Sequence, residues 1–364
     1  MSDSLRGALA TRNNSLNFVR LCLAAAVILG HSWLVGGFDD SPFPKLGWWA
    51  VNGFFAISGY LIAGSRLRTR FLAFIWRRAL RILPAFWVCL IVTAAVVAPV
   101  STLLSGETPD VASAFSYVLR NFALSVQQTG IDGTLDTVPA QGIWNGSLWT
   151  LAYEFGAYLF AGAVLTIAVV RRRTAWVLGA MLVGVSLIYP FVMRVLDNDN
   201  LVIENILRLI GFFLAGMFLY VVGDRISLKT GPFLVSVTVF VALALFGLDD
   251  YFGQVPLAHA LLWLGARMRV PLGRENDISY GLYIWAWPVQ QLLVLAGAQA
   301  LGPWVSALLA LVCTLPLAWL SWKGVEEPAM RLRHLVPVRD TSKNPSPSSA
   351  STPQSPSSAD DPRS

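Results

Sequence analysis

The fold is decided by a stretch near the N-terminus, Asn17-Phe-Val-Arg-Leu-Cys-Leu-Ala-Ala-Ala-Val-Ile-Leu-Gly-His-Ser-Trp-Leu-Val-Gly36. About twenty apolar residues are enough for a helix to cross the ~30 Å hydrocarbon core of a bilayer. Its central part, residues 21–30, follows Arg12 and Arg20 and is also compatible with the apolar core of a signal peptide. We favour a first membrane span, because similar stretches recur along the chain.

Composition points to a membrane protein. Hydrophobic residues make up 55% of the 364 residues and charged residues only 13%, whereas soluble domains are roughly one quarter charged. The predicted fold is therefore all-α, a polytopic transmembrane helix bundle of about ten spans. The nine later spans are expected near residues 46–64, 80–98, 148–170, 175–193, 207–223, 231–247, 252–266, 278–297 and 303–322.

The basic residues predict the orientation of these spans, because cytoplasmic loops are enriched in Lys and Arg. With both termini in the cytoplasm, the outer segments contain only Lys45, Arg120, Arg194 and Arg208, and Arg20 lies within the first span. All remaining Lys and Arg residues then fall on the cytoplasmic side. We predict a multi-pass protein of the bacterial inner membrane with both ends inside.

The chain divides into three predicted parts. Residues 1–16 form a cytoplasmic N-terminal segment and residues 17–335 the membrane domain. Residues 336–364 are rich in Ser and Pro with almost no large apolar residues, which predicts a disordered tail. The longest outer connection, about 99–147, contains a mixed segment, Phe115 to Leu124, that we expect to lie along the membrane surface on the acceptor side.

Two ionisable residues share one face of the first span. Arg20 and His31 are eleven positions apart, which is about three helical turns plus roughly 20° and ~16 Å of rise. Ionisable groups within a span are costly unless they face a cavity or a partner, so the pair predicts a polar path through the bundle. Imidazole titrates near pH 6.5 and is suited to remove a proton from an attacking alcohol. His31 is therefore the candidate base; the alternative is a histidine hydrogen-bonded to a neighbouring helix.

A basic segment, Trp76-Arg77-Arg78-Ala79-Leu80-Arg81, leads into the third span. Arg78 and Arg81 are three positions apart and lie on one helical face. Guanidinium groups match phosphate oxygens, and an acyl-CoA carries a pyrophosphate and a ribose phosphate. We therefore expect Arg78 and Arg81, flanked by Arg77, to bind the donor. The alternative is anchoring of the span by positive charge alone.

Two carboxylates complete the candidate site. Glu154 lies in the outer part of the fourth span, where we expect it to orient His31 or a sugar; pairing with Arg208 or a buried Trp is the alternative. Glu326 follows the tenth span, and capping a helix or pairing with Arg331 explains it without catalysis. Ser58, beside Gly59, is interpreted as a small helix-packing residue.

The sequence gives no support to metal or nucleotide chemistry. It contains neither a nucleophile-elbow motif nor a phosphate-binding loop. The three cysteines lie in apolar stretches, and the three histidines are too scattered for a metal motif. These residues are Cys22, Cys89, Cys313, His31, His259 and His334.

Several segments, in order, resemble the acyltransferase 3 family of integral-membrane acyltransferases over about residues 15–335. The resemblance implies O-acylation of a glycan or small molecule. It also implies that Arg20, His31, Arg78, Arg81 and Glu326 occupy functional positions. The matching elements are Arg20 followed by His31, Phe54-Phe-Ala-Ile-Ser-Gly-Tyr-Leu-Ile62, Arg78-Ala-Leu-Arg81 with Pro84, Ser147-Leu-Trp-Thr-Leu-Ala-Tyr-Glu154, Ile278-Ser-Tyr-Gly-Leu-Tyr-Ile-Trp-Ala-Trp-Pro288 and Val325-Glu-Glu-Pro328.

The resulting hypothesis is an O-acyltransferase that moves an acyl group, acetyl first among the candidates, from cytosolic acyl-CoA to a hydroxyl of a sugar or exported glycan, without a metal. The expected partners are acyl-CoA, the glycan and membrane lipids, with no nucleic acid. Ala286 occupies a position where many family members have His. This difference leaves the class of acceptor open and does not argue against the activity. The rival interpretation is a transporter or flippase for a glycan or lipid-linked sugar, since polar faces in a helix bundle also serve transport.

Overall fold

The computed structural model describes residues 4–11, 13–273 and 275–336. Within these ranges the chain forms helices and no strand, apart from an isolated bridge between Ser4 and Ser227. The predicted all-α class is therefore confirmed. The predicted tail lies outside the described residues except for Val336.

Six helices of the described chain are long and apolar enough to cross a membrane. The other four predicted spans form shorter helices, and the count of about ten spans and the side of each terminus stay predictions. The six are α2 (Leu16–Gly36), α3 (Leu46–Arg68), the continuous helix Phe71–Ser105, the continuous helix Thr174–Val195, α10 (Leu201–Val222) and the continuous helix Pro303–Leu335. The shorter four are α7 (Trp149–Val164), α11 (Thr230–Leu245), α13 (Gln254–Arg267) and α14 (Ser279–Leu295).

Three of the long helices contain a π-helical turn, an irregularity that often marks a functional site. The helix Phe71–Ser105 comprises α4 (Phe71–Val92), η1 (Thr93–Val97) and α5 (Ala98–Ser105). The others comprise α9 (Thr174–Pro190) with η2 (Phe191–Val195), and α15 (Pro303–Ser321), η4 (Trp322–Glu326), α16 (Glu327–Arg331) and the 3₁₀ turn η5 (Leu332–Leu335). The remaining elements are α1 (Leu5–Leu9), α6 (Val111–Asn121), α8 (Ala168–Arg172), α12 (Asp249–Phe252) and η3 (Ala298–Leu301).

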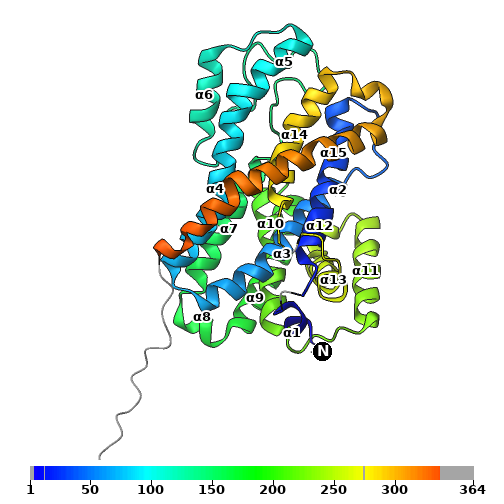
Figure 1. Cartoon of the computed structure of the whole chain (residues 1–364). Coiled ribbons are helices and arrows are strands. Elements are labelled where there is room, and N and C mark those ends of the chain that lie inside the picture. Colours follow the sequence, from blue (N-terminus) through cyan, green and yellow to red (C-terminus); the bar gives the residue numbers. More distant parts are fainter. Residues whose placement is uncertain (1–3, 12, 274, 337–364) are drawn as a thin grey trace, which may run out of the picture.

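The closest helix packing joins α3 to α10 at the centre of the bundle (Figure 1). A Cβ added at Gly59 would lie 2.0 Å from the carbonyl oxygen of Phe213, and one added at Gly216 would lie 1.9 Å from that of Ala56. Small residues permit such close backbone approach between membrane helices. The interpretation of the segment around Gly59 as a packing face is confirmed.

Helix α14 lies in the interior, where it contacts α2 and α15. Ala24 and Ile28 of α2 pack on Leu282 and Ala286 of α14. Ala286 is thus fully buried in this contact. The apolar character of α14 on all sides reflects this burial.

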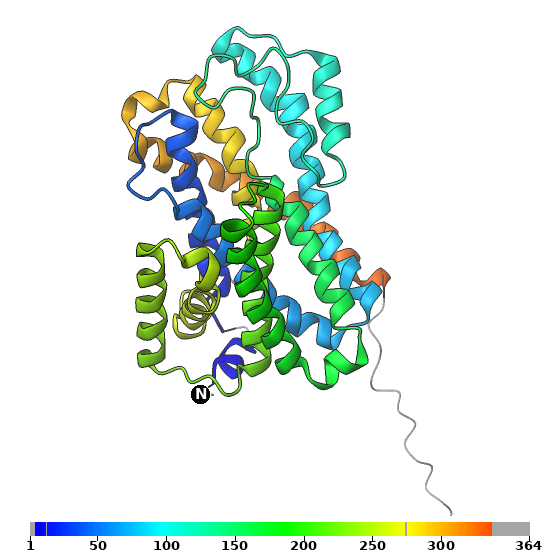
Figure 2. The same cartoon turned by 180° about the vertical axis from the view of Figure 1, so that it is seen from behind.

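The outer connection forms a cap at one end of the molecule, with α5 and α6 opposite α1 and α8 (Figures 1 and 2). On α6, Val111 and Phe115 are 82% and 67% exposed and form an apolar stripe with Leu119; that this segment lies along the membrane surface stays a prediction. The following loop is fixed to α14, because Gln291 donates 2.8 Å hydrogen bonds to the carbonyls of Ala140 and Ile143.

Candidate active site

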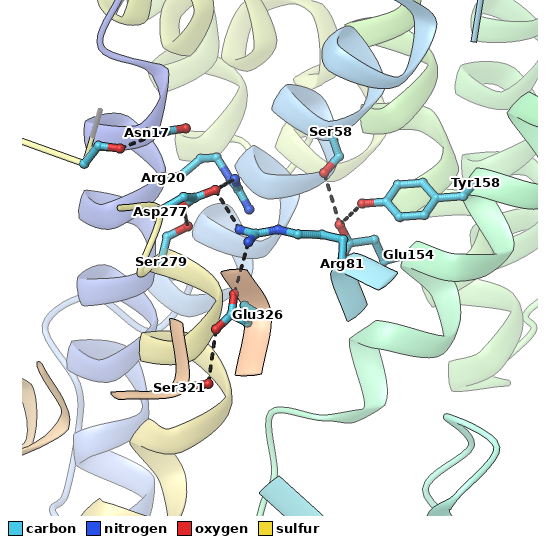
Figure 3. A network of polar contacts seen from close by, with 11 residues as sticks. Asn17, Arg20, Ser58, Arg81, Glu154, Tyr158, Asp277, Ser279, Ser321 and Glu326 are labelled. Atoms are coloured by element: carbon cyan, nitrogen blue, oxygen red, sulfur yellow. Dashed lines mark hydrogen bonds and ion pairs between the residues drawn. The ribbon is translucent and has the colours of Figure 1, made fainter. Parts of the chain in front are cut away.

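Four charged side chains from distant parts of the chain form one network inside the bundle (Figure 3). Arg20 Nη1 and Arg81 Nη2 lie 2.5 Å and 2.6 Å from the same oxygen, Oδ2 of Asp277. Arg81 Nη1 lies 3.0 Å from Oε2 of Glu326. The side chains are 16% exposed or less, so each guanidinium is held against a carboxylate away from bulk water.

Asp277 is placed by the start of α14. It lies in the connection before that helix, and its Oδ1 accepts a 2.6 Å hydrogen bond from the hydroxyl of Ser279. Burial alone would raise the pKa of this carboxyl, but Arg20, Arg81 and the hydrogen bonds of Ser279 outweigh it and lower the pKa to about 2. Asp277 is therefore a permanent anion that joins the two arginines.

Glu326 lies in the π-helical turn η4, which directs its side chain inward. The residue is 1% exposed, and its Oε1 accepts a 3.1 Å hydrogen bond from Ser321. The alternative of pairing with Arg331 is wrong, since Arg331 Nη2 contacts Glu327 instead, at 3.2 Å. The inserted residue of the π turn places the two consecutive glutamates differently: Glu326 faces the network and Glu327 the surface.

A cavity adjoins the network between α2, α3, α4, α7 and α14. Arg78 lines it without an ion pair to any residue of the described chain, and its Nε atom is buried without a hydrogen-bond partner. The Cζ atom of Arg78 lies 5.9 Å from the ring centre of Phe74. Polar lining residues are Arg20, Ser58, Arg78, Arg81, Thr150, Glu154, Tyr158, Ser279, Tyr280 and Tyr283.

Glu154 lies across the cavity from the ion-pair network. It accepts hydrogen bonds from Tyr158 and, at 3.2 Å, from Ser58 (Figure 3). In the described chain no hydrogen bond or ion pair joins Glu154 to His31 or Arg208, so the expected direct contacts are absent; Ser58 of α3 and Tyr158 of α7 hold one of its carboxylate oxygens instead. Ser58 therefore has a polar contact in addition to its position beside a packing glycine.

The ring of His31 packs edge-on against Trp287 with the centroids 4.7 Å apart, and its Nδ1 atom is buried without a hydrogen-bond partner in the described chain. His31 does not line the cavity, whereas Arg20 does. Arg20 contacts Asp277 just before α14, and His31 contacts Trp287 within it. The polar path expected between Arg20 and His31 stays a prediction. Tyr283, one turn before Trp287, lines the cavity.

The structure places the two predicted phosphate-binding arginines, Arg78 and Arg81, in different environments. Both terminal nitrogens of Arg81 contact carboxylates, while Arg78 keeps its guanidinium free of ion pairs within the described ranges. Arg77 does not line the cavity. In residues 4–11, 13–273 and 275–336, no group of three or more His, Cys, Asp and Glu side chains is arranged to hold a metal ion.

Sequence reasoning missed Asp277, the residue that joins the two arginines. The available signal was an isolated carboxylate directly before the segment Ile278–Pro288, at the cytoplasmic end of a predicted span. It also missed the hydroxyls of Thr150 and Tyr283, which lie 2.7 Å apart in the cavity wall. Such pairings between helices are set by tertiary packing.

Comparison with known proteins identifies the family of the chain. The model of the acyltransferase domain of the acyltransferase 3 family matches residues 13–323. An O-acetyl transferase of Shigella phage Sf6 is 30% identical over 339 residues, covering 87% of this chain and 96% of the relative. Nodulation protein 10 of Rhizobium leguminosarum bv. viciae is 26% identical over 364 residues, covering 90% and 95%. No solved structure matches the chain. The chain belongs to the acyltransferase 3 family of membrane acyltransferases.

Proposed function

We propose that this protein transfers an acyl group, acetyl in the first instance, from cytosolic acyl-CoA to a hydroxyl of a sugar or exported glycan. The observation that carries the proposal is the arginine-lined cavity within apolar helices, in which Arg78 has no ion pair among the described residues. A buried cation of this kind favours an anionic ligand. The printed name of the phage relative, an O-acetyl transferase, supports acetyl as the group and oxygen as its acceptor.

In the proposed complex, Arg78 binds a phosphate of the donor. Asp277 and Glu326 hold Arg20 and Arg81 at the cavity wall, where their positive charge steadies the anionic donor. These carboxylates also keep the two guanidinium groups in fixed orientations before the donor binds. Groups fixed in this way bind a ligand with a smaller loss of conformational freedom.

The acceptor hydroxyl attacks the thioester carbonyl carbon, a C–O bond forms and the C–S bond breaks. His31 takes the proton of the hydroxyl and returns it to the leaving thiolate of CoA. Its Nδ1 atom has no partner in the described protein, and a neutral imidazole is the form that accepts a proton. Glu154 and Ser58 position the acceptor from the opposite wall.

The test uses the full chain in lipid nanodiscs with radiolabelled acetyl-CoA. Its acceptor is an exported polysaccharide purified from a strain lacking this gene and de-O-acylated with mild base. Wild type is expected to release CoA thiol and to label the polysaccharide. His31→Ala should lose about a hundredfold or more in rate, as expected for removal of a general base. His259→Ala, which removes another buried histidine in a helix, is the control and should stay active.

Two results would count against the proposal. If His31→Ala retains transfer, the residue has no part in the mechanism. If wild type labels no polysaccharide but moves a glycan across vesicle membranes, the chain is a transporter, the rival that the polar cavity alone leaves open.

A further inference from the structure

A cluster of aromatic side chains lies at the ends of α3 and α7 that the charge pattern places outside. The ring centres of Trp48 and Trp149 are 6.1 Å apart, and those of Trp149 and Tyr153 are 5.5 Å apart. Trp48 is 44% exposed. We call Trp48, Trp149 and Tyr153 the aromatic platform.

The platform rests on a buried cation. The Cζ atom of Arg208, on α10, lies 3.9 Å from the ring centre of Trp48. Arg208 is 1% exposed, and it donates one hydrogen bond, 2.7 Å long, to Asn205 Oδ1. Its Nε atom is buried without a partner, and no carboxylate of the described chain forms an ion pair with it.

Burying an arginine without a carboxylate partner costs free energy, so an arginine at this position is expected to have a structural or functional role. Stacking a guanidinium on indole fixes the orientation of the ring. Arg208 thus holds one face of Trp48, and Trp48 remains 44% exposed. Asp250 and Glu204 lie near enough to attract Arg208, but neither is within ion-pair distance of it, and Asp250 accepts hydrogen bonds from Lys45 and Asn52 instead.

The platform residues do not line the cavity themselves but lie next to lining residues on the same two helices. Along α3, Trp48 begins a stripe at spacings of three and four residues whose next members, Val51, Phe55, Ser58 and Ile62, all line the cavity. On α7, Trp149 is followed by Thr150, which also lines it. A molecule that reaches from the platform along this face of α3 would meet Val51 first and then Phe55.

Aromatic residues also gather at membrane–water interfaces, where they anchor helices and face lipid. The contacts of these residues distinguish a ligand-binding cluster from lipid-facing anchors. Trp48 and Trp149 face each other between two helices, and Trp48 covers a buried arginine of a third. By contrast, Trp304 at the start of α15 is 53% exposed and touches the ring of Trp33 edge-on.

We infer that the aromatic platform is the binding subsite for the sugar ring of the acceptor, with Arg208 as a positioning residue beneath Trp48. A pyranose presents one face of C–H groups, which packs against the electron-rich face of an aromatic ring. Its hydroxyls then extend toward the cavity. The inference rests on the proposed acyl transfer and adds the place where the acceptor binds.

The experiment measures acetyl transfer in nanodiscs while the concentration of the de-O-acylated polysaccharide, or that of acetyl-CoA, is varied. Trp48→Ala should raise KM for the polysaccharide about tenfold or more, since the sugar ring loses the aromatic surface on which it packs. KM for acetyl-CoA should stay unchanged. Trp48→Phe should restore most of the loss, and Arg208→Lys should fall between Trp48→Ala and wild type.

Trp304→Ala is the matched control, because it removes an outer, half-exposed tryptophan away from the platform. An unchanged KM for the polysaccharide in Trp48→Ala overturns the subsite. So does an equal effect on both KM values, which would show that Trp48 acts only through packing. If wild type transfers no acetyl group to the polysaccharide, the proposed function itself fails. If only the platform is misassigned, wild type stays active and the variants follow Trp304→Ala.

Discussion

Arg20 and Asp277 lie 2.5 Å apart, although 257 positions separate them in the sequence. The same carboxylate oxygen also contacts Arg81. The first, third and ninth predicted spans are thereby tied together at one end of the cavity. This ion pair makes the stability of the bundle depend on a residue of the candidate active site.

Replacing Asp277 with Asn should destabilise the folded protein, because it leaves the buried guanidinium of Arg20 without a carboxylate and that of Arg81 with Glu326 alone. Breaking a buried pair typically costs about 3–5 kcal/mol. The thermal unfolding midpoint of the purified protein should therefore fall by several degrees. Asp224→Asn is the control, since the Arg6–Asp224 pair is 40% and 56% exposed and such pairs contribute about 0–1 kcal/mol. Equal shifts in the two variants would show that the network does not stabilise the fold.

The same carboxylate predicts a dependence of stability on pH. The pKa of Asp277 is lowered from 3.8 to about 2 in the folded protein. Its contribution is fully present above the unfolded pKa and is lost as pH falls from about 4 toward 2, amounting to about 2 kcal/mol. The difference in unfolding midpoint between wild type and Asp277→Asn should shrink over this range. A constant difference would contradict the assignment.

Arg78 and its neighbour Arg77 offer a direct comparison for donor binding. Only Arg78 lines the cavity, and hydrogen bonds to charged groups contribute about 1.5–3 kcal/mol. Arg78→Gln should raise KM for acetyl-CoA about tenfold or more. Arg77→Gln should change it little, because positive-inside anchoring is shared by the whole basic segment. Similar effects from both substitutions would indicate anchoring alone.

The close contact between α3 and α10 predicts that adding a single methyl group there destabilises the folded protein. Gly216→Ala would place a Cβ 1.9 Å from the backbone oxygen of Ala56, so the helices must separate at a cost of about 1–3 kcal/mol. At Gly184, on α9, an added Cβ meets nothing within 4 Å. Gly184→Ala should be neutral or stabilising by up to about 1 kcal/mol. Unfolding midpoints and detergent-resistant yield of the two variants provide the measurement.

Much of the fold follows from hydropathy alone. Each of the ten predicted stretches coincides with a helix, because an apolar run of this length has few other ways to satisfy its backbone in lipid. The interruptions within the helices were not predicted. The π turn before Glu327 packs against α4, and single-residue propensities are insensitive to such tertiary contacts.

The candidate site was predictable as a list of residues but not as a set of contacts. Arg20, Arg78, Arg81 and Glu154 do gather around one cavity, as expected for costly groups within spans. The pairing of Arg20 and Arg81 with Asp277 was not predicted. Asp277 lies in a polar connection, where a carboxylate is common and gives no signal. Ion pairs between segments far apart in the chain depend on helix order in space, which a one-dimensional pattern does not contain.

The shared carboxylate also has a consequence for how the protein is made. Arg81 is synthesised 196 positions before Asp277, an interval of roughly ten to forty seconds at ordinary translation rates. Until the ribosome completes that later segment, the guanidinium groups of α2 and α4 have no acidic counterpart and require water or lipid headgroups. The charged network of the folded protein can therefore form only after the chain up to Asp277 has been made.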